Sequence, residues 1–184
     1  MLTTVVVTVV LLVPPVAADM TTVRDPDDTS GRLDVKVLSH RHARQGGVLI
    51  HRLGTHHNWR DSRLRGPRNY IYFWFSTDKE DRYAEKRIVI DFRDGGLRAW
   101  IESYQEFSDG AGVGPARRIR VRRPNRHSVS VLFSQKALVG ERGGKYGWSA
   151  STAFKSARSA GCDARACFDS APVGAKRGLI SHRV

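Results

Sequence analysis

Three consecutive runs of β-branched and aromatic residues between Asn69 and Tyr104 constrain the fold more than any other stretch. The runs are NYIYFWFSTD, RIVIDFRDGG and LRAWIESY, separated by a polar break and by Asp94-Gly95-Gly96. Such runs divided by turn residues are typical of an antiparallel meander, and a short Asp-Gly loop is a strong hairpin signal. The first run is apolar on both faces, which indicates a central strand.

Shorter alternating segments precede and follow this meander. They predict strands at 33–37, 48–53, 116–123, 128–133 and 145–154, and one helical turn at 134–138. Residues 54–68 and 105–115 are expected to be loops because they are basic or rich in glycine. The pattern predicts an all-β protein, an antiparallel, jelly-roll-like β-sandwich of about eight strands.

The chain is expected to divide into four segments. Residues 1–18 have the pattern of a signal peptide cleaved after Ala18, with an uncleaved anchor as the alternative. Residues 19–32 are expected to be an extended, Asp-rich segment, 33–170 the sandwich, and 171–184 a disordered basic tail. This organisation predicts a secreted, extracellular bacterial protein that has no integral membrane association after cleavage.

The two cysteines are Cys162 and Cys167. An even number of cysteines in an exported chain predicts a disulfide. A zinc site is the alternative, but it requires two further ligands held nearby.

The chain carries a net charge of +13, and arginine greatly outnumbers lysine. This charge predicts attraction to a polyanion, such as an acidic glycan or a cell-wall polymer, although a GC-rich genome also favours arginine. Arg118, Arg120 and Arg122 share one face of a predicted strand and are candidate ligand-binding residues; a solvated outer face is the alternative. Nucleic acid is a weaker candidate because no zinc-finger, RNP or helix-turn-helix pattern is present.

Aromatic residues form a second candidate site. Trp100 and Tyr104 share a strand face, as do Tyr70, Tyr72 and Trp74. Exposed rings on a sheet stack against the C–H groups of sugars, so Trp100 and Tyr104 are candidate glycan contacts. The alternative is that these rings fill the core. Trp59, in an arginine-rich loop, is expected to be exposed and to bind ligand as well.

Carboxylates gather near the predicted start of the sheet, at Asp25, Asp27, Asp28 and Asp34. Ca²⁺ prefers six to eight oxygen ligands, which an Asp-rich loop can supply. Asp163 and Asp169 would join this candidate calcium site if the two ends of the chain meet. The alternative is that the aspartates solvate and turn a linker.

The stretch DPDDTSGRLDV at residues 25–35 and the segment YFWFSTD at 72–78 carry a resemblance to known proteins. They resemble the opening and the central strand of secreted bacterial domains of the carbohydrate-binding module family 9 and of DOMON-like jelly rolls. The resemblance covers most of residues 25–154, although Asp27-Asp28 replaces the usual Gly-Asp. It implies a jelly-roll sandwich that binds sugar, haem or calcium.

No catalytic motif accompanies these features. His40, His42, His51, His56 and His57 could hold Zn²⁺ or Cu²⁺, but they lack a His-Glu-x-x-His spacing. The sequence therefore predicts an exported, non-catalytic binding module for a glycan or an anionic wall polymer. The alternatives are an extracellular hydrolase that uses a carboxylate pair and a scaffold domain that binds another protein.

Overall fold

The computed structural model describes residues 19–43, 47–77, 84–107, 110–140, 144–155, 162, 167–172 and 179–183. The expected signal peptide lies outside these residues. These residues include two short helices, η1 (Asp61–Leu64) and α1 (Gln135–Val139). The strands are β1 (Asp19–Arg24), β2 (Val35–Ala43), β3 (Val48–Thr55), β4 (Tyr70–Ser76), β5 (Lys86–Arg93), β6 (Gly96–Phe107), β7 (Gly110–Asn125), β8 (Ser128–Ser134), β9 (Lys145–Phe154), β10 (Cys167–Ala171) and β11 (Ile180–Arg183). Neither described helix is long and apolar enough to cross a membrane.

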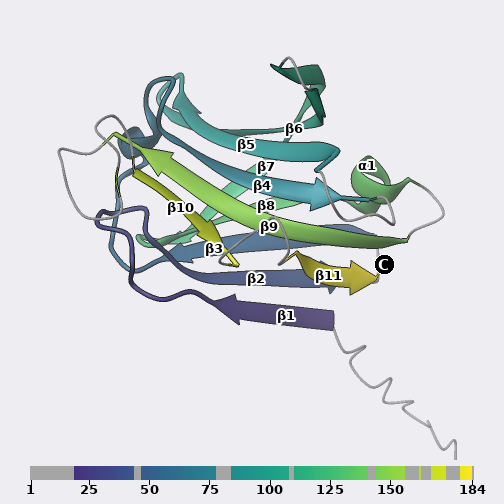
Figure 1. The fold of residues 1–184 in the computed structure, drawn as a ribbon, viewed down its shortest axis with the longest axis horizontal. Helices are drawn as coiled ribbons and strands as arrows, with labels where there is room; N and C mark the ends of the chain where they lie inside the picture. Colours follow the sequence, from purple (N-terminus) through teal and green to yellow (C-terminus); the bar gives the residue numbers. More distant parts are fainter. Residues whose placement is uncertain are drawn as a thin grey trace, which may run out of the picture.

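All of these strands pair antiparallel in one folded sheet (Figure 1). Their order is β1-β2-β3-β8-β7-β6-β5-β4-β9-β10, and β11 also pairs with β9. The long strand β7 turns the sheet over, because it pairs with β6 up to Ile119 and with β8 from Arg120. The prediction of an all-β fold is confirmed, with an 11-stranded sheet in place of about eight strands.

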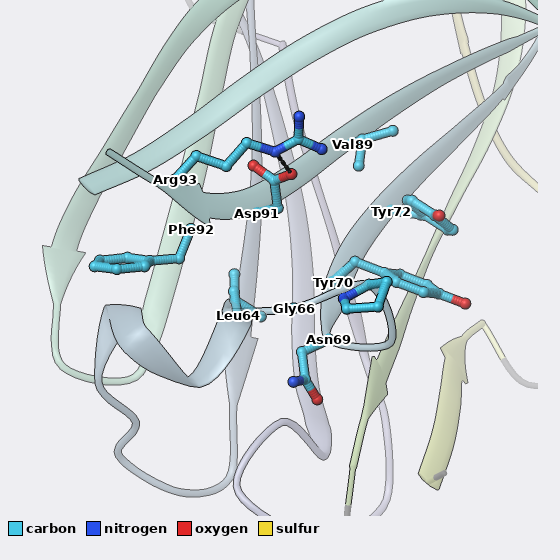
Figure 2. Close-up of a pocket in the computed structure, with 10 residues that line it drawn as sticks. Leu64, Gly66, Asn69, Tyr70, Tyr72, Val89, Asp91, Phe92 and Arg93 are labelled. Carbon is cyan, nitrogen blue, oxygen red and sulfur yellow. Dashed lines mark hydrogen bonds and ion pairs between the residues drawn. The ribbon is translucent and has the colours of Figure 1, made fainter. Parts of the chain in front are cut away.

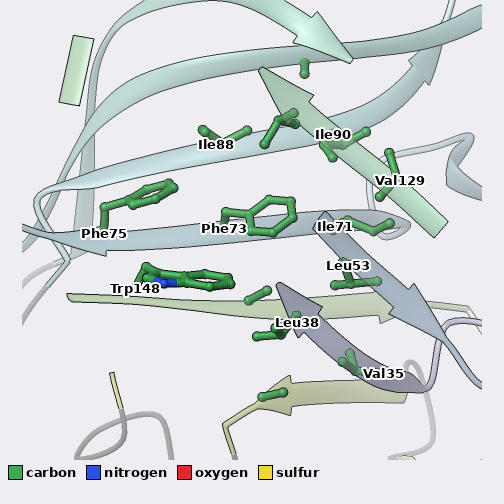
Figure 3. Packing of buried hydrophobic residues seen from close by; sticks show 14 of the residues in the cluster. Val35, Leu38, Leu53, Ile71, Phe73, Phe75, Ile88, Ile90, Val129 and Trp148 are labelled. Carbon is green, nitrogen blue, oxygen red and sulfur yellow. The ribbon is translucent and has the colours of Figure 1, made fainter. Parts of the chain in front are cut away.

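The core lies between the two halves of this folded sheet (Figure 3). On β4 the alternation directs Ile71, Phe73 and Phe75 inward, where all three are fully buried. Strands of the other half supply Leu53 and Val129 to the same cluster. The inward placement of the three β4 residues agrees with the strand pattern, because side chains two apart share a face.

The last strand of the sheet comes back beside β2. Asp169 of β10 accepts a hydrogen bond from the backbone N–H of Val35, at 2.5 Å. Next to it, the Thr152 hydroxyl donates to the backbone carbonyl of Leu33, at 2.8 Å. We call this junction between β9–β10 and the start of β2 the seam; side chains bridge it, and two ends of the chain meet there.

Both ends of the described chain are more ordered than expected. Residues 19–24 form β1 and pair with β2, so the strand structure begins before residue 33. The prediction of a disordered tail over 171–184 is wrong for Ile180–Arg183, which pair with Lys145–Trp148 of β9. Ile180 explains this docking, because it is 8% exposed and joins the core cluster.

The expected loop at 105–115 is also wrong, because β6 continues to Phe107 and β7 starts at Gly110. Glycines keep their backbone donors and acceptors, so a glycine-rich stretch can continue a hairpin. At Gly114 a Cβ would lie 3.0 Å from the Cβ of Ser103, so close approach of the two strands favours glycine. The expected helical turn is confirmed as α1, which starts after the Ser134 cap.

Candidate metal centre and outer aromatic face

A cluster of carboxylates lies at the seam. Asp25 and Asp28 lie in the segment between β1 and β2, and Asp169 lies in β10. Ligand oxygens of these three residues lie within 4.8 Å of one another, the one such group of metal-ligating type among the described residues. The sequence-based expectation that Asp169 joins the N-terminal aspartates is therefore met. Asp163 lies outside the described residues.

Asp34 adds a buried carboxyl group to this cluster. It is fully buried just before β2, and its carboxyl group lies within hydrogen-bonding reach of the Asp27 and Asp169 carboxyl groups. Neither of its oxygens receives a hydrogen bond from a donor in the described part of the chain, and neither does Oδ2 of Asp25. Carboxylates are acceptors only, so a proton, a bound water or a cation is needed to satisfy these oxygens.

The crowding raises three pKa values. Burial, and then the negative charges of Asp169 and Asp28, raise the pKa of Asp25 to about 6. Burial, followed by the contacts with Asp27 and Asp169, raises the pKa of Asp34 to about 8. Burial also raises the pKa of Asp169, against the hydrogen bonds it accepts from Val35 and Ser170. Full ionisation of the cluster at neutral pH is therefore unfavourable without a cation.

The His56 imidazole lies beside the cluster. His56 Nδ1 lies 4.0 Å from an oxygen of Asp27, and His56 lowers the pKa of Asp25. A single imidazole does not balance five carboxyl groups. Hard dications such as Ca²⁺ bind several carboxylate oxygens. The clustered carboxylates of Asp25, Asp28 and Asp169 fit such an ion. Asp34 lies against Asp169 and Asp27 at the edge of this group.

The outer surface near the cluster is hollowed. A hollow of about 350 Å³ is lined by Asp28, Thr29, Phe168 and Asp169, among others. The Phe168 ring is more than half exposed. The metal centre is therefore reachable from solvent on this side.

Three of the histidines lie away from this cluster, whereas His56 lies beside it and His57 is exposed. His40, His42 and His51 are buried, and the rings of His40 and His51 lie 4.7 Å apart in the core. His51 Nε2 lies 3.2 Å from the Tyr146 hydroxyl, and its ring packs edge-on against Trp148. These contacts give the histidines a packing role in the core.

Aromatic rings line the opposite, outward face of β4. Tyr70 and Tyr72 stack with ring centroids 3.9 Å apart, and Tyr72 packs edge-on against Trp74 at 5.1 Å. Trp74 also contacts Tyr104 of β6 at 5.1 Å. We call these four residues the aromatic row; all of them are partly exposed. The alternative that they fill the core is therefore wrong.

Arg87 lies in the middle of the aromatic row. Its guanidinium carbon is 4.7 Å from the ring centre of Tyr72 and 4.9 Å from that of Tyr104. Its Nε donates to Glu102 at 2.7 Å. The sequence reasoning missed Arg87 and Glu102. Both residues alternate with the buried residues of two neighbouring predicted strands, so both side chains are expected to point outward. An arginine and a glutamate on the same outward face of neighbouring strands would have indicated this pair.

Trp100 lies on the same outer face and is also partly exposed. The Arg93 guanidinium lies 5.1 Å above its ring, and Arg118 is its direct partner on β7. Arg118, Arg120 and Arg122 are all exposed, while Ile119 and Val121 pack against the core. The predicted arrangement of the arginines on one strand face is thus present, and their ligand-binding role stays a prediction.

Trp59 is not the exposed ring that the sequence led us to expect. It is 3% exposed, and the Arg123 guanidinium lies 3.5 Å from its ring centre. Its backbone N–H donates to the Arg126 carbonyl at 3.0 Å, which folds the loop against the β7–β8 turn. The Arg123 side chain covers the ring, which removes Trp59 from the candidate ligand contacts.

The predicted disulfide joins Cys162 and Cys167. Cys167 is fully buried at the start of β10. The bridge therefore ends two residues before Asp169 of the aspartate cluster.

Comparison with known proteins identifies no relative: no family model, curated protein or solved structure matches the chain.

Proposed function

We propose that this protein is an exported, non-catalytic binding module that holds a glycan or an anionic wall polymer on the outer face of β4, β5 and β6. The observation that carries the proposal is the aromatic row, whose rings stay partly exposed instead of entering the core. A ring face packs against the C–H groups of a sugar, while neighbouring polar groups accept and donate hydrogen bonds to its hydroxyls.

The fixed orientation of the row supports binding. Trp74 Nε1 donates to the Ser151 hydroxyl at 2.8 Å, and Glu102 holds Arg87 between the rings. A rigid surface loses little conformational entropy when a ligand stacks on it. The affinity for a sugar is therefore higher than it would be if the rings had to be ordered on binding.

Positive charge at the edge of this face supports the anionic wall polymer, which is the other ligand that we propose. Arg118, Arg120 and Arg122 lie exposed along β7, and Arg118 pairs with Trp100 of the outer face. Together with the net charge of +13, they would attract an anionic polymer at low salt.

We propose Ca²⁺ as the ion of the metal centre. When bound, it supplies positive charge between Asp25, Asp28, Asp34 and Asp169. The ion would join the segment after β1 to β10 and so stabilise the seam. The buried, donor-free oxygens of Asp34 support this proposal most directly.

The finer description of the fold is also a proposal. One layer of a jelly-roll-like β-sandwich would contain β1, β2, β3 and β8, the other β4, β5, β6 and β9–β11, with β7 in both. Side chains from both layers in one core support it. The relationship to carbohydrate-binding module family 9 and DOMON-like domains remains a prediction, and so does export, which the disulfide favours.

A hydrolase is the second candidate function, because one observation favours it. Asp28 and Asp169 line the same 350 Å³ hollow. Glycoside hydrolases place two carboxyl groups in one cleft, and one of them has a raised pKa. Release of sugar from polysaccharides by the wild-type protein but not by Asp28→Asn would establish this function instead.

A glycan and polyanion array at graded salt tests the leading proposal. Binding to a neutral or acidic glycan at low salt is expected, and Trp74→Ala should weaken it. Glu102→Gln, which releases Arg87, should weaken it less. Absence of binding to every array member at low salt would reject the proposal.

A further inference from the structure

The outer face contains a second feature beside the aromatic row. A hollow of about 390 Å³ lies between the loop that follows η1 and strands β4 and β5 (Figure 2). Its walls include Leu64, Asn69, Tyr70, Tyr72, Asp91 and Arg93. Small-ligand pockets commonly have volumes of roughly 300 to 1,000 Å³, so the hollow is large enough for a small molecule or one end of a longer one.

Asp91 places a buried acceptor in this hollow. It lies on the outward face of β5 but is only 8% exposed. Its Oδ2 accepts from Arg93 Nε at 2.6 Å, whereas its buried Oδ1 has no hydrogen-bond partner among the described residues. A buried acceptor without a donor is unfavourable. A ligand hydroxyl that reaches Oδ1 from the hollow would satisfy it.

Tyr70 and Tyr72 supply an apolar wall. Their rings are stacked, and they lie away from the Asp91–Arg93 pair across the hollow (Figure 2). Burial raises the pKa of both phenols, so the rings stay neutral. A pyranose ring has the matching surface, with C–H groups on its faces and hydroxyls at its rim.

The charges in the hollow favour an uncharged ligand. Arg93 balances the Asp91 carboxylate and lies over Trp100 on its other side. A ligand carboxylate would meet the Asp91 carboxylate, and a ligand cation would compete with Arg93 for it. The hollow therefore disfavours anionic ligands by repulsion from Asp91, and cationic ligands because they compete with Arg93.

The geometry points to a binding subsite for one uncharged sugar residue, stacked on Tyr70 and hydrogen-bonded through a hydroxyl to Asp91 Oδ1. This inference depends on the proposed glycan-binding function and selects neutral glycans over acidic polymers. Tyr70 and Tyr72 belong to both the hollow and the aromatic row. The end of a sugar chain occupies the hollow while the following residues lie along Trp74 and Tyr104.

Calorimetric titration with neutral gluco-, manno- and xylo-oligosaccharides, and with oligogalacturonate as the acidic counterpart, tests the inference. We expect a neutral oligosaccharide to bind the wild-type protein more tightly than oligogalacturonate does. Asp91→Ala and Tyr70→Ala should each raise its Kd about tenfold or more, because each removes one of the two contacts. Asp94→Asn, in the exposed turn that follows β5, is the matched control and should bind as the wild type does.

The outcomes separate the two proposals. If Trp74→Ala weakens binding while Asp91→Ala and Tyr70→Ala do not, the hollow is not the subsite and the proposed function stands. Tighter binding of oligogalacturonate overturns the selection of neutral glycans. If no oligosaccharide binds the wild-type protein, the subsite inference fails, and the glycan and polyanion array at low salt decides whether the proposed function also fails. Thermal melting of each variant identifies any loss of folding, and Tyr70→Phe, which keeps the ring, should retain binding.

Discussion

The Asp169 carboxylate of β10 accepts a hydrogen bond from the backbone N–H of Val35 in β2, at 2.5 Å, across the seam. The same carboxyl group belongs to the aspartate cluster that forms the candidate metal centre. A single side chain therefore links closure of the sheet to the charge state of the aspartate cluster. Stability, pH and cation binding should depend on one another in this protein.

The first prediction concerns the hydrogen bond across the seam that involves no carboxylate. Thr152→Val keeps the size of the side chain but removes the donor to the Leu33 carbonyl. A buried carbonyl is then left without that partner, which should lower the free energy of unfolding by about 1 to 3 kcal/mol. Urea denaturation measures this change. Thr152→Ser retains the hydroxyl and should recover most of the loss.

The second prediction concerns calcium. Ca²⁺ should raise the melting temperature, and a chelator should lower it by several degrees, because an ion that binds only the native state stabilises it by mass action. Asp34→Asn should remove most of the calcium response. Asp94→Asn, which alters an exposed carboxylate outside the cluster, should respond as the wild type does. Equal melting curves with calcium and with chelator would contradict the site.

The third prediction concerns pH in the absence of divalent ions. The folded-state pKa values of Asp25 and Asp34, about 6 and about 8, lie above the ordinary value of 3.8. Between these limits the folded state holds more protons than the unfolded state, so its stability falls as pH rises from about 4 to about 8. Denaturation across this range measures the slope.

Calcium and Asp34→Asn serve as the controls for that slope. The amide that replaces the carboxyl group in this variant cannot ionise, so the variant should lose less stability than the wild type between about pH 6 and about pH 8. Saturating calcium should flatten the wild-type curve in the same way, because the ion replaces the protons. Stability that rises with pH in chelator would show that the cluster is not crowded in solution.

The fourth prediction separates two tryptophans. Trp59→Ala should lower the free energy of unfolding by about 3 to 5 kcal/mol, since it empties a buried site and uncovers Arg123. Trp74→Ala should cost less stability but weaken glycan binding roughly two- to tenfold. Denaturation and titration of both variants measure the contrast. A binding defect confined to Trp59→Ala would reverse our assignment.

Much of this arrangement could be predicted from local patterns. Alternation on β4 assigns Ile71, Phe73 and Phe75 to the core, and alternation on β7 assigns Arg118, Arg120 and Arg122 to solvent. Both follow from a period of two residues and need no knowledge of distant partners. The aspartates at 25–34 could be found for the same reason, because most of the cluster is close in sequence.

Features that depend on distant partners could not be predicted in this way. Trp59 lies in an arginine-rich loop, and only its contact with Arg123, 64 residues away, shows that the ring is covered. Similarly, the short apolar stretch at Leu179-Ile180 becomes a strand because β9 offers a free edge. Charge and glycine content describe a segment by itself, whereas burial depends on what the rest of the chain places against it.

One edge of β9 is covered end to end by two short strands, with β10 pairing to residues 150–154 and β11 to 145–148. A chain shortened to end at Pro172 would leave the backbone groups of the first half of that edge without a partner strand. Such an edge is a template for a strand of another molecule. By pairing with this edge, Ile180–Arg183 should prevent such strand addition, and their removal should promote oligomers.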